Sequence, residues 1–145
     1  MRGIRSFVSW VLALCLFAAL VIAVDAKLLS DPEKANVVFT LLAERTGQEL
    51  FEPTGRYVVG VIEAFVALML ILPFTRRFGA IILLVVSGAL LAAHASPLLG
   101  QEIPLEIGSA KTDGASAFYL TMAMTIGAGL LMFIHPRRRR RRTYN

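Results

Sequence analysis

Residues 57–74 read YVVGVIEAFVALMLILPF, an apolar run interrupted by one acid, Glu63, and closed by Pro73. As an α-helix, a run of this length rises about 27 Å at roughly 1.5 Å per residue, close to the ~30 Å hydrocarbon core of a bilayer. Three further runs of similar length lie at residues 7–24, 78–99 and 115–134. The sequence therefore predicts an all-α fold, a membrane-embedded four-helix bundle with four transmembrane helices, in a single domain over residues 1–145.

The composition agrees with this prediction. Of the 145 residues, 57% are hydrophobic and 17% are charged, whereas soluble domains have roughly 45–50% apolar and about 25% charged residues. A soluble single-core protein is therefore excluded. The one cysteine, Cys15, excludes an intrachain disulfide and a redox pair of thiols.

The charges between the apolar runs predict the orientation. Ten basic residues and no acid lie before the first run, between the second and third, and after the fourth, whereas the two other connections hold five basic residues and nine acids. Because cytoplasmic flanks retain Lys and Arg, we expect a multi-pass protein of the cell (inner) membrane with both termini cytoplasmic. In the basic cytoplasmic tail, residues 137–145, the run Arg137–Arg142 is expected to bind anionic lipids rather than nucleic acid.

The first apolar run has an alternative interpretation as a cleaved signal peptide, because Arg2 and Arg5 precede it and Val24-Asp25-Ala26 resembles a cleavage site. The apolar core of a signal peptide usually has about 7–15 residues, and this run is longer. We therefore expect an uncleaved first span.

The outer loop at residues 25–55 is long enough to hold a helix of its own. Asp31 before Pro32 is typical of a helix start, and Gly47 is typical of a stop. Between them, one face is apolar: Ala35, Val38, Leu41 and Leu42. We expect a short amphipathic helix that lies on the membrane surface or caps the bundle. The second outer loop, residues 100–114, shows no periodicity and is expected to be irregular.

Ionisable residues appear in the outer half of the predicted bundle. Glu63 lies about 10 Å along its helix from Arg56, and an acid inside a span costs roughly 2.5–3.5 kcal/mol on insertion scales. Lys27 and His94 lie at similar depth, so we expect Glu63 to face the interior within reach of one of them. The cluster acts either as a polar clamp or as a functional site, while the apolar runs of the cytoplasmic half contain no comparable group.

Small residues recur at a spacing of four, at Gly88, Ala92 and Ser96 and again at Ala123 and Gly127. Such rows mark close helix packing in membranes. We expect them to pack inside the bundle, with a homo-oligomer interface as the alternative.

The chain lacks other motifs for chemistry. No metal site is predicted, because His94 and His135 lie toward opposite ends and no carboxylates accompany them at ligand spacing. There is no glycine-rich phosphate loop and no pair of histidines at one depth for haem. No cofactor is predicted, although a quinone remains possible.

Several short segments follow one another in the four-span chain: Asp25-Ala26-Lys27-Leu28, the stretch from Gly55-Arg56 through Gly60 to Glu63, the turn from Arg76 to Ala80, and His94. Together they resemble the DoxX family over residues 7–134. The resemblance implies a bacterial four-helix membrane protein in a superfamily that includes a quinone-linked thiosulfate oxidoreductase subunit. It also implies that Lys27, Arg56, Glu63 and His94 are the polar or ligand-binding positions. The long acidic outer loop and the six-arginine tail depart from the family pattern.

Three functions remain open. The first is a non-catalytic or accessory membrane subunit linked to a redox or envelope-stress system, with a protein partner from a redox complex. The second is a quinone-binding subunit of an oxidoreductase, in which His94 and Glu63 hydrogen-bond the quinone. The third is a small-solute transporter, which needs a polar route through the membrane. On its own the chain is not expected to be an enzyme.

Overall fold

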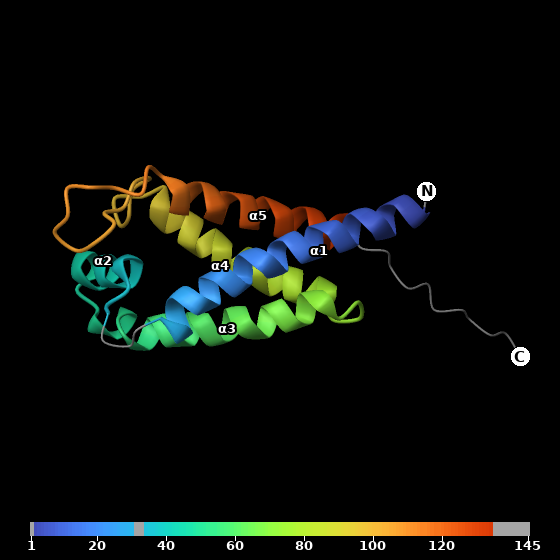
Figure 1. Ribbon diagram of the computed structural model, residues 1–145, viewed down its shortest axis with the longest axis horizontal. Coiled ribbons are helices and arrows are strands. Elements are labelled where there is room, and N and C mark those ends of the chain that lie inside the picture. The colour runs from blue at the N-terminus through green and yellow to red at the C-terminus, as the bar shows by residue number, and fades with distance from the viewer. Residues whose placement is uncertain (1, 31–33, 135–145) are drawn as a thin grey trace, which may run out of the picture.

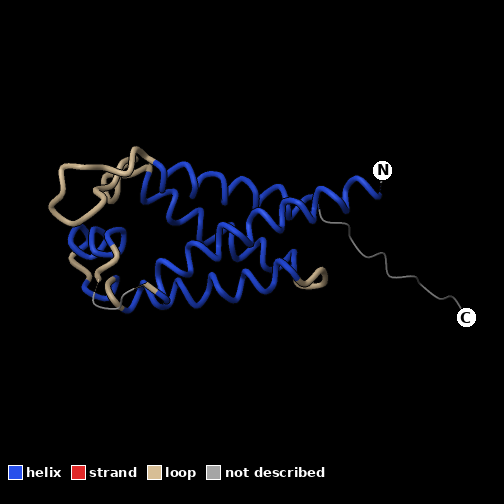
Figure 2. Tube along the Cα trace, in the orientation of Figure 1, coloured by secondary structure: helices blue, strands red, loops and turns tan. Residues whose placement is uncertain are grey.

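The computed structural model describes residues 2–30 and 34–134. Over these residues the protein is helical, and its extended pairing is limited to an isolated bridge between Pro104 and Thr112. Four long helices lie side by side, each long and apolar enough to span a membrane (Figures 1 and 2). They are α1 (Arg2–Val24), α3 (Thr54–Ile71), α4 (Arg76–His94) and α5 (Ser116–Ile134).

The four helices run between two chemically different ends (Figure 1). The start of α1, the turn from α3 to α4 and the last residues of α5 form what we call the basic end, where Arg5 Nη2 donates to the Phe133 carbonyl at 3.4 Å. The other end, which we call the capped end, carries the π-helix η1 (Asp25–Leu29), α2 (Val37–Thr46), the 3-10 helix η2 (Glu49–Phe51) and residues 95–115.

The bundle core forms where each helix meets its neighbours: α4 packs on α5, α1 on α3, and the contacts of α3 with α4 and of α1 with α5 close the ring. Leu20, Leu70 and Leu131 are fully buried there. Gly127 permits close packing of α5 on α1, since a Cβ at this position would lie 3.1 Å from Leu16 Cδ2. Outward-facing side chains such as Phe65 are apolar and exposed, as expected for helices that contact lipid.

The small residues of α4 do not pack as expected. A Cβ on Gly88 would meet no atom within 4 Å, and Ala92 is exposed. Gly88 and Ser96 are half-buried, and the row does not form a close contact between helices at Gly88 or Ala92. On α5, Gly127 is buried but Ala123 is exposed, so only one of that pair contributes to packing.

At the capped end, α2 and the second outer loop pack together. Leu41 and Leu42 are buried against Leu99 and Ile103, and Arg45 Nη1 donates to the Pro97 carbonyl at 2.6 Å. The expected amphipathic helix is therefore present, and it caps the bundle through its apolar face. Its stop at Gly47 is also confirmed, because Gly47 adopts φ +69°, the left-handed conformation that ends a helix readily only at glycine.

The expected start of this helix is wrong. Asp31 and Pro32 lie outside the described residues, but residues 34–36 are not helical and the helix begins at Val37. The side chain of Asn36 accepts a hydrogen bond from the Val38 N–H at 3.1 Å, so Asn36 is the N-cap. Ala35 consequently precedes the helix and is exposed instead of sharing its apolar face.

The ends of the long helices also differ from the expected spans. The third span was expected to reach Leu99, but α4 ends at His94, because Pro97 has no N–H and disfavours helical geometry at the residue before it. Likewise α3 ends at Ile71, just before Leu72-Pro73. The first helical segment is longer than expected, since α1 begins at Arg2 and continues directly into η1.

Candidate functional site

Lys27 and Glu63 form a buried ion pair between η1 and α3. Lys27 Nζ lies 2.8 Å from Glu63 Oε2, and the two side chains are only 11% and 6% exposed. Nζ also donates to the Ala23 carbonyl at 3.3 Å. The expectation that Glu63 faces the interior within reach of Lys27 is confirmed. The pair connects η1 to α3.

Gly60 allows η1 to approach α3 closely enough for this pair. A Cβ at Gly60 would lie 2.7 Å from Leu28 Cδ2 and 3.1 Å from Lys27 Cβ, both too close for an undisturbed fit. Because Gly60 precedes Glu63 by three residues, the two lie on neighbouring positions of one helix face. The absent side chain at Gly60 thus leaves room for the backbone that presents Lys27.

Arg56 has a different set of partners. Its side chain is 3% exposed, and Nη1 lies 3.3 Å from Glu52 Oε1. Nη1 also donates to the Lys34 carbonyl at 2.9 Å, and Nη2 donates to Tyr57 Oη at 3.0 Å. Arg56 therefore anchors the loop before α2 to the start of α3. Glu52 and Arg56 are four residues apart, but Glu52 is extended and precedes α3, so helix periodicity does not predict their contact.

His94 closes α4 beneath the second outer loop. It is 1% exposed, and its Nδ1 lies 2.9 Å from the Gly100 carbonyl. A carbonyl only accepts, so Nδ1 carries the proton and Nε2 of a neutral ring is an acceptor. Nε2 is buried without a hydrogen-bond partner among the described residues, and the ring meets Phe118 edge-on with centroids 6.2 Å apart.

The four candidate residues therefore form three separate groups. Within residues 2–30 and 34–134, no hydrogen bond or ion pair joins the Lys27–Glu63 pair to Arg56 or to His94. The alternative partner expected for Glu63, His94, is bonded to Gly100 instead. The same described residues contain no group of three His, Cys, Asp or Glu side chains placed to hold a metal ion.

A buried cation lies at the basic end, just outside the apolar runs, and its burial was not expected from the sequence. Arg76, expected in a connection, is the first residue of α4 and is 1% exposed. Its Nε donates to the Leu70 carbonyl at 2.8 Å, and its guanidinium carbon lies 3.9 Å from the centroid of the Trp10 ring. Arg76 thus caps the end of α3 and stacks on α1, an arrangement that joins a C-terminal carbonyl contact to a cation–π contact.

Asp113 organises the entry to α5, a role that sequence reasoning missed. Its Oδ1 accepts from the N–H groups of Ile103 and Ala115 at 3.1 Å, and its Oδ2 accepts from that of Ala117 at 2.8 Å and from the Ser116 hydroxyl. Burial disfavours the charged carboxylate, but these hydrogen bonds outweigh it and hold the pKa of Asp113 below its ordinary value. An Asp just before an apolar run, here two residues before the run at 115–134, is the sequence signal for such a cap.

No family model matches this chain, and no curated protein or solved structure matches it significantly. The DoxX resemblance thus stays a prediction from the short segments that carry it.

Proposed function

We propose that the protein is an inner-membrane, four-span protein of the DoxX type with both termini in the cytoplasm. The basic end would face the cytoplasm, because Arg5, Arg76 and Arg77 gather there, and the acidic connections lie at the capped end. The preference of cytoplasmic flanks for Lys and Arg supports this orientation.

We further propose that it acts as a non-catalytic accessory subunit of a membrane complex. The observation that carries this proposal is that three of the four candidate side chains, Lys27, Arg56 and Glu63, are held in ion pairs within the chain. Glu63 is paired with Lys27 at 2.8 Å, and Arg56 is paired with Glu52 and the Lys34 carbonyl. Such pairs hold helices in register without chemistry. The link to a redox or envelope-stress system rests on the DoxX resemblance alone.

The test is isolation of the protein in its native lipid, followed by mass spectrometry of co-purified chains after mild cross-linking. We expect one protein partner at a fixed stoichiometry, and retention of that partner in the Glu63→Gln variant provided that the variant folds. Isolation of the chain without any stoichiometric partner would contradict an accessory role.

A quinone-binding subunit is the second candidate, and one observation favours it. His94 Nε2 is a buried acceptor without a partner among the described residues, so it fits one hydroxyl donor of a reduced quinone. Glu63 does not supply the second hydrogen bond to the quinone that was expected, because its carboxylate is bonded to Lys27. A quinone would supply the electron chemistry, while His94 would orient one oxygen of the ring.

The corresponding test compares co-purified quinone in the parent and in His94→Phe. Loss of quinone from a folded variant would support this candidate, and equal quinone content in both would reject it. Phe is chosen because it fills the ring volume while removing the acceptor.

A further inference from the structure

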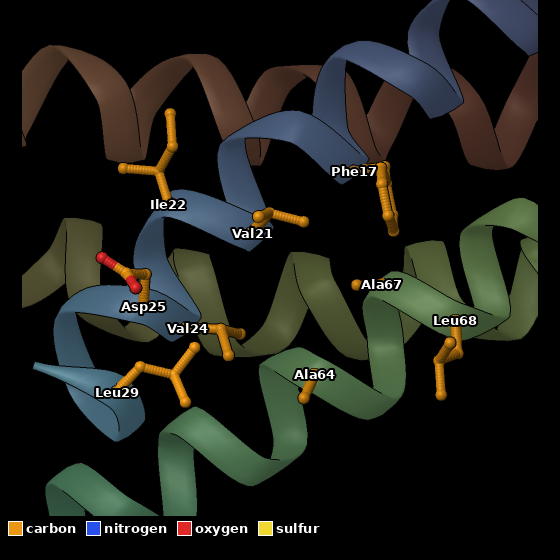
Figure 3. Close-up of a pocket in the computed structure, with 9 residues that line it drawn as sticks. All are labelled: Phe17, Val21, Ile22, Val24, Asp25, Leu29, Ala64, Ala67 and Leu68. Atoms are coloured by element: carbon orange, nitrogen blue, oxygen red, sulfur yellow. The ribbon is translucent and has the colours of Figure 1, made fainter.

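An apolar groove runs between the first helical segment and α3 on the outer surface of the bundle (Figure 3). Its volume is about 520 Å³, within the range of roughly 300–1,000 Å³ typical of small-molecule sites. Phe17, Val24 and Leu29 point toward α3 in Figure 3, where Ala64 and Ala67 provide small side chains that leave the groove open.

The length of the groove favours a lipid chain over a helix. From Phe17 to Leu29 the first helical segment rises about 18 Å at roughly 1.5 Å per residue. This is close to half of the ~30 Å hydrocarbon core, the depth of one leaflet. A transmembrane helix of a partner or of a second copy would need a groove along the full thickness of the hydrocarbon core, whereas an acyl chain occupies one leaflet.

Asp25 lies at the capped end of this groove and specifies the chemistry of a headgroup. It lines the groove, is exposed, and makes no side-chain hydrogen bond or ion pair with the other described residues. An uncompensated carboxylate at the boundary of the hydrocarbon attracts a cationic donor and repels anionic headgroups. A primary ammonium offers three N–H donors, as the side chain of lysine does, whereas a quaternary choline offers none.

We propose that this groove binds a phospholipid with a primary-amine headgroup, phosphatidylethanolamine. One acyl chain lies along Phe17 and Val24 over Ala64 and Ala67, and the ammonium donates to the Asp25 carboxylate. The site is independent of the accessory role proposed above, since it uses none of the candidate residues of that function.

Native mass spectrometry of the purified full chain in detergent tests this site. The protein is titrated with phosphatidylethanolamine or phosphatidylcholine of identical acyl chains, and the one-lipid adduct is measured. We expect phosphatidylethanolamine to bind about tenfold more tightly, the factor for one charge-assisted hydrogen bond. Asp25→Asn should bind the two lipids equally, while Glu44→Gln on the exposed side of α2 should keep the preference.

Filling the groove provides the second arm. Ala64→Leu should weaken binding of both lipids severalfold, whereas Ala92→Leu, the same change on an exposed part of α4, should leave binding unchanged. Equal binding of the two lipids by the parent overturns the proposal, as does a preference that survives in Asp25→Asn. Lipid adducts replaced by a dimer that Ala64→Leu abolishes would also overturn it, because a second copy would then fill the groove. If Ala64→Leu fails to fold by circular dichroism, the Asp25→Asn comparison still decides.

Discussion

The Lys27 and Glu63 side chains are both largely buried, with exposed fractions of 11% and 6%. Burying two charges carries a desolvation cost that their attraction only partly offsets, so the pair adds little net stability over an apolar pair. Removing one partner is different, because the remaining charge is left buried and unpaired. The pair therefore acts mainly by favouring the one arrangement of η1 and α3 in which both buried charges are paired.

A comparison of Glu63→Gln, Lys27→Met and the double variant tests this effect. Each single change should destabilise the protein by about 3–5 kcal/mol, and the double variant should recover a large part of that loss. The measurement is thermal aggregation in detergent, with Glu44→Gln as a control for loss of an exposed acid. Additive losses in the double variant would contradict a coupled pair.

At the scale of the elements, α5 depends on Asp113 for its first turn and η1 depends on Gly60 for its contact with α3. Asp113 accepts backbone N–H groups from both the loop and the helix, so it joins the cap to α5. Gly60 acts by what it lacks, since a Cβ there would meet Leu28 and Lys27. Each position couples one element to its neighbour, so substitutions there should lower the stability of the protein.

The Asp113 carboxylate is expected to make stability at the capped end depend on acid. Its pKa is lowered on folding, so its contribution is complete above the ordinary Asp pKa of about 3.9 and is lost as pH falls through the lower folded value. Asp113→Ala should therefore cost about 1 kcal/mol at pH 7, and its difference from the parent should shrink as the pH approaches 3.

Asp113→Ser keeps an acceptor that does not titrate near these values, and it serves as the matched variant. Its difference from the parent should be smaller at pH 7 than that of Asp113→Ala. The measurement is thermal aggregation at both pH values. A difference between Asp113→Ala and the parent that is constant or grows toward pH 3 would contradict this interpretation.

Gly60→Ala and Gly88→Ala form a matched pair of helix substitutions. Gly60→Ala should destabilise by about 1–3 kcal/mol, because the added methyl overpacks against Leu28 and Lys27. Gly88→Ala should be neutral or stabilising by up to about 1 kcal/mol, because its Cβ meets no atom within 4 Å and alanine favours the helix. Equal effects of the two changes on thermal aggregation would show that η1 does not depend on Gly60.

On the scale of the whole molecule, the bundle separates its charges between two ends. Arg5 and Arg76 contact carbonyls at the basic end, whereas α2 and the second outer loop cover the capped end. A chain with this distribution is expected to insert with the capped end outside. The cap would then be the part of the protein that faces the extracytoplasmic space.

Cysteine labelling tests this orientation in a Cys15→Ala background. Gln48→Cys and Gln101→Cys, both exposed at the capped end, should react with an impermeant thiol reagent on intact cells. Asn145→Cys in the tail should react only after the cells are opened. Labelling of the tail alone on intact cells would reverse the proposed topology.

The sequence by itself determined the number of long helices, because run length and hydrophobicity are local properties that can be read without knowing the neighbours of a segment. It also determined the Gly47 stop, since the left-handed conformation favours glycine at that position. The Lys27–Glu63 contact could be predicted from the sequence for a related reason. An acid at that depth must find a cation or a proton, and the chain offers few partners there.

Only the tertiary structure decided where the other polar side chains go. His94 bonds to Gly100, Arg56 to Glu52 and the Lys34 carbonyl, and Arg76 stacks on Trp10. These choices depend on how loops fold back over helix ends and on which helix lies beside which, and neither is encoded by hydrophobic periodicity. The same holds for the groove beside Ala64, which exists because of the way α1 and α3 pack together.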